Sequence, residues 1–177
     1  MKITYNQMDE SFLTCPYDYY DHELHEDVIG TNWKQEVQHT VNKIVYEFFE
    51  TPFSKRTNGY VIKIISDYWC RLDRTIFDSI QQFLSISAVV IDHLMSFLEN
   101  NKHFKLSGAF DPYSIMELQN GSETVIFEKM LLEVDEHLLK TYYDVAKRYY
   151  FTKHGFFPRR IEVVDLIHAK RYVHFPT

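Results

Sequence analysis

The chain has 177 residues, of which 45% are hydrophobic, and it carries a formal net charge of −6. This length suits about one domain, which can bury a sizeable core without disulfide bonds or metals. The acidic balance argues against a general nucleic-acid-binding protein, because contact with phosphates requires a basic surface. We therefore expect residues 1–177 to form a single globular domain.

Charge is unevenly distributed along the chain. Residues 1–30 contain seven acidic residues and one basic residue, whereas residues 140–177 contain three acidic and eight basic residues. The two ends could attract each other within the fold, or one of them could bind an oppositely charged partner. Because residues 1–30 are also rich in tyrosine, we expect them to form an ordered acidic segment packed on the domain.

The two cysteines, Cys15 and Cys70, lie far apart, and no secretory leader is visible at the N-terminus. This pattern favours buried, reduced thiols in a cytoplasmic protein. The apolar-rich run over residues 83–98 is interrupted by polar residues and is too short to span a membrane. The low content of Ala and Gly, with many Ile, Tyr, Phe and Lys, favours a bacterial or phage source.

A first helix is expected over residues 31–50, because its apolar residues recur at helical spacing. Thr31 or Asn32 can cap its start, and Pro52 ends it. Residues 2–5 could form a short edge strand. Residues 60–65 are β-branched and could form a strand or the first turns of the next helix, and we assign them to a strand.

A second helix is expected from about residue 67 to residue 100, with an interruption possible near residues 85–87. Its segment 83–98 has the highest apolar density and is the best candidate for a buried central helix. Beyond it, Asn120-Gly121 is a turn signal that could join two strands, over residues 115–118 and 124–127.

A third and longest helix is predicted over residues 122–151. From residue 127 onward its apolar positions are spaced 4, 3, 4, 4, 3 and 4 residues apart, which is typical of one face of a helix. This spacing favours the helix over the two-strand alternative. Gly155 fits the position just past a helix end. Residues 161–167 could be a strand or a short helix, and residues 172–175 a terminal strand.

These elements predict an α+β fold that is mainly α. Three long amphipathic helices pack together with a small sheet drawn from residues near 2–5, 60–65 and 161–175, and an all-α bundle is the alternative. The predicted core comprises Trp33, Val37, Val41, Ile44, Phe48, Ile76, Ile80, Phe83, Val90, Leu94, Leu131, Val134, Leu138 and Val145.

Several His and carboxylate residues have spacings found in metal sites. His22 and His25 lie within the acidic run 18–27, and three further pairs are Glu36 with His39, Glu133 with His137, and Asp165 with His168. Bundles that hold two metals use two Glu-x-x-His pairs, whereas this chain has one. Solvated surface residues explain these patterns more simply, so we expect no metal and no cofactor.

No nucleophile elbow, Walker loop, dinucleotide-binding glycine motif or Cys-x-x-Cys motif occurs in the sequence. Arg71 and Arg74 could activate Cys70 if its thiol were exposed, but a buried inert thiol is the simpler expectation. The sequence therefore leans away from an enzyme.

The basic end of the chain is interleaved with aromatic residues. Such a pattern forms core aromatics with a basic rim, a contact for a protein or an anionic ligand, or a nucleic-acid surface. The residues are Tyr149, Tyr150, Lys153, His154, Phe156, Phe157, Arg159, Arg160, Lys170, Arg171, Tyr172 and His174.

These features favour a small, cytoplasmic, non-enzymatic protein-binding protein: an inhibitor, an immunity-type protein or a regulatory adaptor. Its partner would be another protein, basic where it meets the acidic segment, and neither a general nucleic acid nor a membrane. The alternatives are a metal-dependent hydrolase that uses His22, His25, His39 or His137, and a self-associating structural protein. The expected contact residues are Tyr17, Asp18, Tyr19, Tyr20, Asp21, Glu23, Glu26, Asp27, Arg159 and Arg160.

Overall fold

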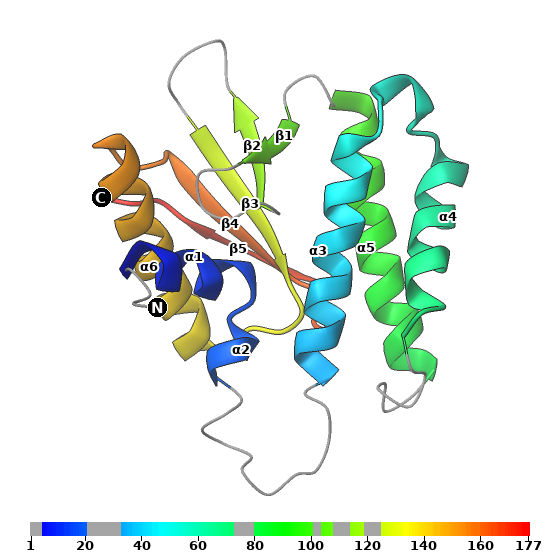
Figure 1. Cartoon of the computed structure of the whole chain (residues 1–177), viewed down its shortest axis with the longest axis horizontal. Helices are drawn as coiled ribbons and strands as arrows, with labels where there is room; N and C mark the ends of the chain where they lie inside the picture. Colours follow the sequence, from blue (N-terminus) through cyan, green and yellow to red (C-terminus); the bar gives the residue numbers. More distant parts are fainter. Residues whose placement is uncertain (1–4, 21–32, 73–79, 101–103, 108–113, 119–124) are drawn as a thin grey trace, which may run out of the picture.

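Helices and one mixed sheet make up the part of the chain described by a computed structural model, which covers residues 5–20, 33–72, 80–100, 104–107, 114–118 and 125–177 (Figure 1). The helices are α1 (Tyr5–Thr14), α2 (Tyr17–Tyr20), α3 (Trp33–Glu50), α4 (Asn58–Trp69), α5 (Ile80–Asn100) and α6 (Glu136–His154), with a 3-10 turn at Phe53–Lys55. The strands are β1 (Phe104–Ser107), β2 (Ser114–Leu118), β3 (Val125–Leu131), β4 (Arg160–Asp165) and β5 (Lys170–His174). The fold is α+β and mainly α, as predicted, and the sheet rules out the all-α alternative.

The five described strands lie side by side in the order β1-β2-β3-β4-β5. Neighbouring strands are antiparallel except β3 and β4, which are parallel. Parallel neighbours need a crossover connection, and α6 supplies it. The chain from β3 to β4 is therefore a βαβ unit, and β3 is the middle strand of the described sheet.

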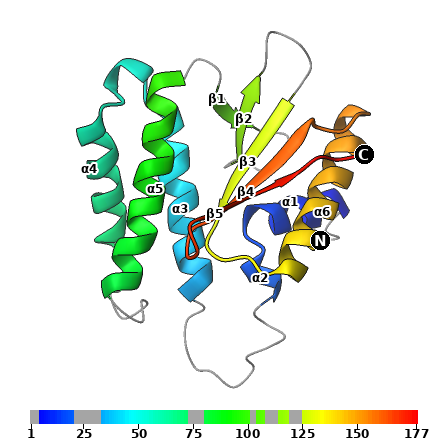
Figure 2. The ribbon, with the colours of Figure 1, turned by 180° about the vertical axis from the view of Figure 1, so that it is seen from behind.

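The sheet lies between two groups of helices. Figures 1 and 2 show α1, α2 and α6 on one side and α3, α5 and α4 on the other, with α4 outermost. Ring contacts agree, because Phe127 on β3 meets Tyr150 of α6 at 5.0 Å between centroids. On the opposite face, Glu128 of β3 meets His93 of α5. Central strands buried on both faces are expected in this layered arrangement.

The prediction of one helix over residues 122–151 is wrong in its first part. Residues 125–131 form β3, and α6 begins at Glu136, where the Asp135 side chain accepts a hydrogen bond from the Leu138 amide at 2.7 Å. Residues 126–132 are all buried, because helices pack on both faces of the sheet and strands lie on both sides of β3. The end of the helix is as predicted, with Gly155 in the left-handed conformation at φ 76°.

The strand predicted over residues 60–65 is also wrong, because these residues lie in α4. Thr57 caps that helix by accepting a hydrogen bond from the Tyr60 amide, and Val61, Ile64 and Ile65 form its buried face. Residues 2–4 lie outside the described part of the chain, and Tyr5 already belongs to α1. The strands expected over residues 161–175 are confirmed as β4 and β5.

The helix expected over residues 67–100 is divided between two elements. α4 ends at Trp69 and α5 begins at Ile80, and residues 73–79 lie outside the described part. The possible interruption near residues 85–87 is absent, because α5 continues through it and the Ser87 hydroxyl bonds back to the Phe83 carbonyl.

Most of the predicted core is buried. Trp33, Phe83 and Val145 are only partly buried, Ile76 lies outside the described residues, and no side-chain position is described for Ile80. The remaining nine members are buried: Val37, Val41, Ile44, Phe48, Val90, Leu94, Leu131, Val134 and Leu138.

A buried amide joins α3 to the end of β3. The Gln38 side chain donates to the Met130 carbonyl at 2.9 Å and accepts from the Leu132 amide at 2.9 Å. It also donates to Asn42, whose own amide donates to the Thr14 carbonyl of α1. These bonds satisfy backbone groups that the ladder leaves open, and they fix α3 against both the sheet and α1.

Within the described residues, one helical window is long and apolar enough to cross a membrane, Gln81–Leu98 in α5, with a mean hydropathy of 1.2. A core helix passes the same test. Ile86, Val90 and Leu94 belong to the hydrophobic core, but only 33% of the window is buried, so the prediction of a buried central helix is correct for one side of α5 alone. The window alone says little about location, and the cytoplasmic location stays a prediction.

Candidate functional site

Two glutamates lie side by side on the face of the sheet that α5 covers. Glu128 on β3 and Glu162 on β4 are register partners, and each is about 5% exposed. Arg171 of β5 contacts both carboxylates, at 3.3 Å from Glu128 Oε1 and through a short hydrogen bond to Glu162. Arg160 Nε lies 2.6 Å from Glu162 Oε1. Two buried negative charges thus have two arginines as counter-charges.

His93 completes this network from α5. Its Nε2 atom lies 3.2 Å from Glu128 Oε2, and both side chains are buried. Burial acts to raise the pKa of Glu128, but His93 and Arg171 outweigh it and hold that pKa below its ordinary value. Burial and the neighbouring Glu128 carboxylate raise the pKa of Glu162, against the opposing effect of Arg171 and Arg160.

Such a pair of carboxyl groups with divergent pKa values could donate and accept a proton. Arginines engage both carboxylates, however, and the charges nearly balance. We interpret the network as the electrostatic connection between β3, β4, β5 and α5. Structural ion-pair networks shift pKa values in the same way.

A different feature lies at the C-terminal end of α6. Phe151, Phe156 and Phe157 are 47%, 39% and 37% exposed, and the rings of Phe151 and Phe157 meet at 4.9 Å between centroids. Phe156 packs edge-on against Tyr150 at 5.5 Å. Lys153 and Arg159 are exposed beside them in the chain. We call these five residues (Phe151, Lys153, Phe156, Phe157, Arg159) the α6–β4 surface.

The end of β5 lies beside the start of β4, close to the α6–β4 surface. β5 is an edge of the described sheet, and His174 pairs with Ile161 at the start of β4. Phe175 follows directly and is 62% exposed, while Val173 is 44% exposed. Side chains alternate along β5, so Val173 shares the α5-facing side of the strand with Arg171, whereas His174 faces Tyr143 of α6. Val173 therefore lies on the other face of the sheet from α6.

A third feature is a group of potential metal ligands between α3 and the turn that joins α1 to α2. Ligand atoms of Cys15, Asp18 and His39 all lie within 4.8 Å of one another, and His39 Nε2 is 3.6 Å from Asp18 Oδ2. Cys15 is fully buried. Burial and the Asp18 carboxylate raise the pKa of its thiol to about 12, so the thiol by itself is a poor nucleophile.

The structure separates the predicted contact residues. Arg159 is exposed and belongs to the α6–β4 surface, whereas Arg160 is half-buried and pairs with Glu162. Tyr19 is 41% exposed. The side chain of Tyr20 is not described, and Asp21, Glu23, Glu26 and Asp27 lie outside the described residues together with His22 and His25.

Tyr17 is corrected from a contact residue to a core residue. It is 3% exposed, and its hydroxyl donates to the Glu133 carbonyl while accepting from the Glu133 amide at 2.8 Å. A tyrosine enclosed in this way holds α2 against the β3–α6 connection and offers no surface to a partner. Asp18 is half-buried, and its carboxylate lies 3.6 Å from the His39 ring.

The remaining metal-like pairs have other partners. Glu133 pairs with Lys34 at 3.1 Å, and His137 is exposed. The His168 ring lies 2.8 Å from the buried carboxylate of Asp165, the last residue of β4. The same carboxylate accepts a hydrogen bond from the His168 amide. Cys70 is exposed at the end of α4, so the expectation that both thiols are buried is wrong for this one. It follows Trp69, the last buried position of that helix.

Glu128, Glu162 and His93 were not predicted to form a group, and Cys15 was not predicted to lie near His39. One local signal was present: Glu128 and Lys129 interrupt an otherwise apolar run from Val125 to Leu132. Charges within such a run indicate either a solvent-facing helix side or buried charges with partners. The partners come from distant segments.

Comparisons with protein-family models, curated protein sequences and solved structures give no match to this chain. A function must therefore be argued from the geometry of its own residues.

Proposed function

We propose that this protein is a non-enzymatic protein-binding protein, of the inhibitor, immunity or adaptor type, and that the α6–β4 surface is its contact region. The observation that carries the proposal is the exposure of three phenylalanines at one corner of the sheet, two of them in ring contact. Contiguous exposed apolar side chains with a polar rim are typical of protein-interaction sites.

The partner's chemistry follows from the rim. Lys153 and Arg159 place positive charge beside the exposed rings. Arg160 and Arg171 on the adjoining strands do not add to this charge, because they pair with the buried carboxylates of Glu128 and Glu162. A partner that presents apolar side chains surrounded by carboxylates complements this surface. Aromatic side chains then supply most of the affinity, and the charges raise the association rate.

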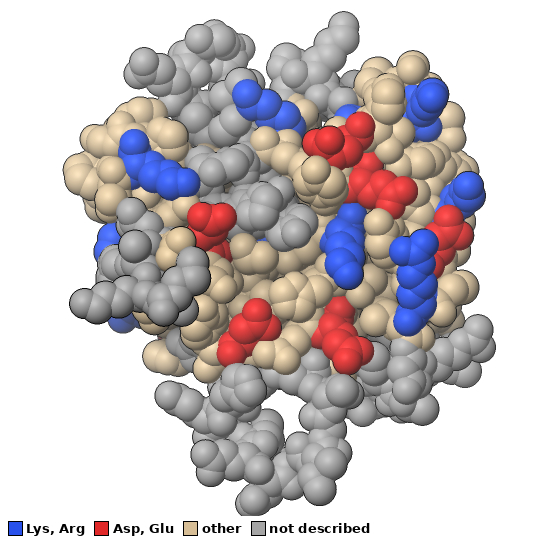
Figure 3. All heavy atoms as spheres, viewed as in Figure 1, with Lys and Arg blue, Asp and Glu red and all other residues tan. Residues whose placement is uncertain are grey.

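The acidic segment adds a second part to the proposal. Its carboxylates over residues 21–27 lie outside the described residues, so the expected basic contact stays a prediction. On the face shown in Figure 3, the described positive and negative side chains are interspersed. The separation of charge along the sequence therefore does not give this face a single sign of charge.

The test compares three forms of the full chain, each immobilised and exposed to extract of the native host. The first is wild type, and the second replaces Phe151, Phe156 and Phe157 with serine. The third is a matched control, F53S/I62S, which removes two similarly exposed side chains, 48% and 50%, on the opposite side of the molecule (Figure 1).

A protein retained in stoichiometric amount by wild type and by F53S/I62S, but not by the triple variant, supports the proposal once the purified pair forms a complex. Charge reversal of Lys153 and Arg159 should then slow association, most strongly at low salt. Equal retention by all three forms would contradict the proposal. So would a homodimer that dissociates in the triple variant, because that result assigns the surface to self-association.

A further inference from the structure

Three side chains of different chemistry converge between two segments distant in the sequence. Cys15 supplies a thiol, Asp18 a carboxylate and His39 an imidazole, with ligand atoms mutually within 4.8 Å. Among the described residues, no other group of three such side chains satisfies this criterion. The cluster does not contribute to the α6–β4 surface, and the proposed function does not use it.

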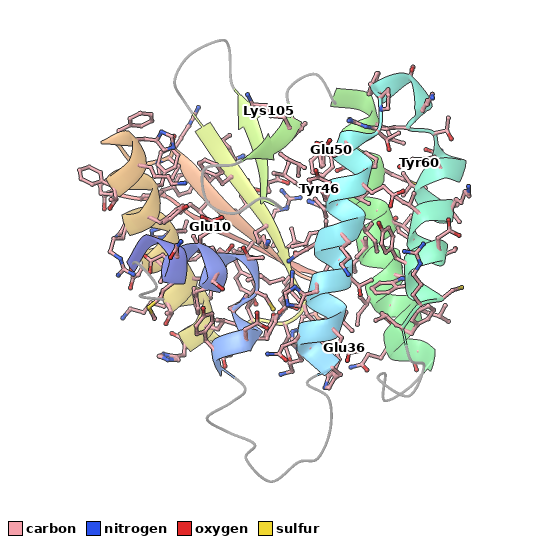
Figure 4. The ribbon with its side chains drawn as sticks, in the orientation of Figure 1. Glu10, Glu36, Tyr46, Glu50, Tyr60 and Lys105 are labelled. Carbon is pink, nitrogen blue, oxygen red and sulfur yellow. The ribbon has the colours of Figure 1, made fainter. Side chains whose placement is uncertain are left out.

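The backbone that carries these side chains is held by bonds that do not involve them. The Asn42 amide donates to the Thr14 carbonyl at 3.0 Å, which joins α3 to the end of α1. The Gln35 amide donates to the Tyr17 carbonyl at 3.5 Å. Tyr17 in turn is bound to Glu133. The turn between α1 and α2 therefore has a fixed position relative to His39, which lies one turn beyond Glu36 on α3 (Figure 4).

We propose that Cys15, Asp18 and His39 form a Zn²⁺ site with three protein ligands and a fourth position open to water. Zinc bonds of about 2.0 Å to nitrogen or oxygen and about 2.3 Å to sulfur place tetrahedral ligand atoms about 3.3 to 3.6 Å apart. The shorter value applies to a nitrogen–oxygen pair, and the 3.6 Å separation of His39 Nε2 and Asp18 Oδ2 is slightly longer than this. Cys15 Sγ lies within 4.8 Å of both atoms, so zinc binding requires the three ligand atoms to move closer together.

The ligand set selects the metal. Magnesium and calcium require oxygen ligands, whereas a thiolate with an imidazole and one carboxylate suits zinc. The exposures also fit metal entry, because the His39 and Asp18 side chains are 46% and 34% exposed and Cys15 is buried. Metal approaches from the solvent side, and the buried sulfur provides the least mobile ligand.

The experiment uses the full chain with any affinity tag removed and with metal stripped by chelator. Cobalt is titrated first, because a Co²⁺–thiolate bond gives a near-ultraviolet charge-transfer band and tetrahedral geometry gives intense visible bands, and zinc is then used to displace it. The test variants are C15S, D18A and H39A. The matched controls are C70S, which removes the exposed cysteine of α4, and H137A, which removes an exposed histidine of α6.

One equivalent of cobalt with a thiolate band is expected in wild type, C70S and H137A. C15S should lose the band, and D18A and H39A should bind zinc at least about tenfold more weakly. Because Cys15 is buried, its serine variant could unfold, so D18A and H39A at the exposed ligands decide the result. Absence of stoichiometric binding in wild type, or unchanged affinity in both of these variants, would overturn the proposal. No partner protein is present, so failure here leaves the proposed function untouched.

Discussion

At the scale of single residues, His174 and Tyr143 form a stacked pair between β5 and α6, with ring centroids 4.6 Å apart and planes inclined by 17°. Burial lowers the pKa of His174 below 6.5, Lys147 adds to this effect and Asp144 opposes it. Burial also raises the pKa of Tyr143. Both rings are therefore neutral in the folded protein at neutral pH.

This pair makes stability depend on pH in a defined direction. A histidine with a lowered folded pKa binds fewer protons in the folded chain than in the unfolded chain, so its contribution is lost as pH falls below 6.5. H174F keeps a stacked ring and removes the titration. We expect the free energy of unfolding of H174F to fall less steeply than that of wild type between about pH 6.5 and pH 5.

The measurement is urea unfolding at a series of pH values. H137F, at an exposed position on α6, is the control and should keep the wild-type slope. A slope in H174F equal to that of wild type would show that His174 takes up its proton equally in both states.

At the residue scale, the sequence predicted whether a side chain is buried or exposed more reliably than it predicted the partner that the side chain contacts. The exposure of Arg159 and the burial of Cys15 were expected from the chemistry of each side chain. The role of Tyr17 was not, because it depends on Glu133, which is 116 residues away in the chain. Pairings of this kind depend on the fold and have no local pattern.

At the scale of elements, α6 starts at a strong local signal. The Asp135 side chain accepts a hydrogen bond from the Leu138 amide. Its negative charge is favourable at the N-terminus of a helix. We expect D135A to lower the free energy of unfolding by about 1 kcal/mol. D135S retains a capping oxygen and should lose less.

Chemical denaturation of both variants checks this, with D144A on the exposed side of the same helix as control. D144A lacks a capping role and should stay within about 0.5 kcal/mol of wild type. Equal losses in D135A and D135S would indicate that charge, and not the cap, stabilises the helix start.

The same element shows why periodicity misplaced a boundary. Phe127, Leu131 and Val134 continue the spacing of α6 backwards, yet the first two belong to β3. In a helix with this spacing, Glu128 and Lys129 would lie on the solvent-exposed side, but in the strand both residues are buried. In a strand covered on both faces there is no alternation to recognise, so a few buried charges can imitate the helical period.

At the scale of the whole molecule, two helical layers share one sheet. Leu13 of α1 and Leu94 of α5 are both fully buried, on opposite sides of that sheet. We expect L13A and L94A each to lower the free energy of unfolding by about 2 to 5 kcal/mol, through lost burial and the cavity left behind. If the predicted single domain is correct, both should lower the midpoint of one shared transition.

Urea unfolding followed by tryptophan fluorescence and by circular dichroism tests this, with L84A as control because Leu84 is 58% exposed. Two transitions, one sensitive to L13A and the other to L94A, would contradict the prediction of a single domain.

The sequence by itself determined the features that depend on neighbouring residues. Helical spacing predicted α3 and the main part of α5, Pro52 marked the end of α3, and Gly155 marked the end of α6. The β-branched segments near the C-terminus predicted β4 and β5. These signals are short-range: spacing, caps and backbone preference act within a few residues.

Tertiary structure alone decided which charges are buried and which side chains meet. Glu128 is stable within β3 because His93 of α5 and Arg171 of β5 pair with it. Residues 60–65 are helical because the apolar face of α4 packs against α3 and α5. The approach of Cys15 to His39 likewise requires α1 and α3 to be in place. Burial and charge pairing depend on contacts between distant segments, and only the completed fold creates those contacts.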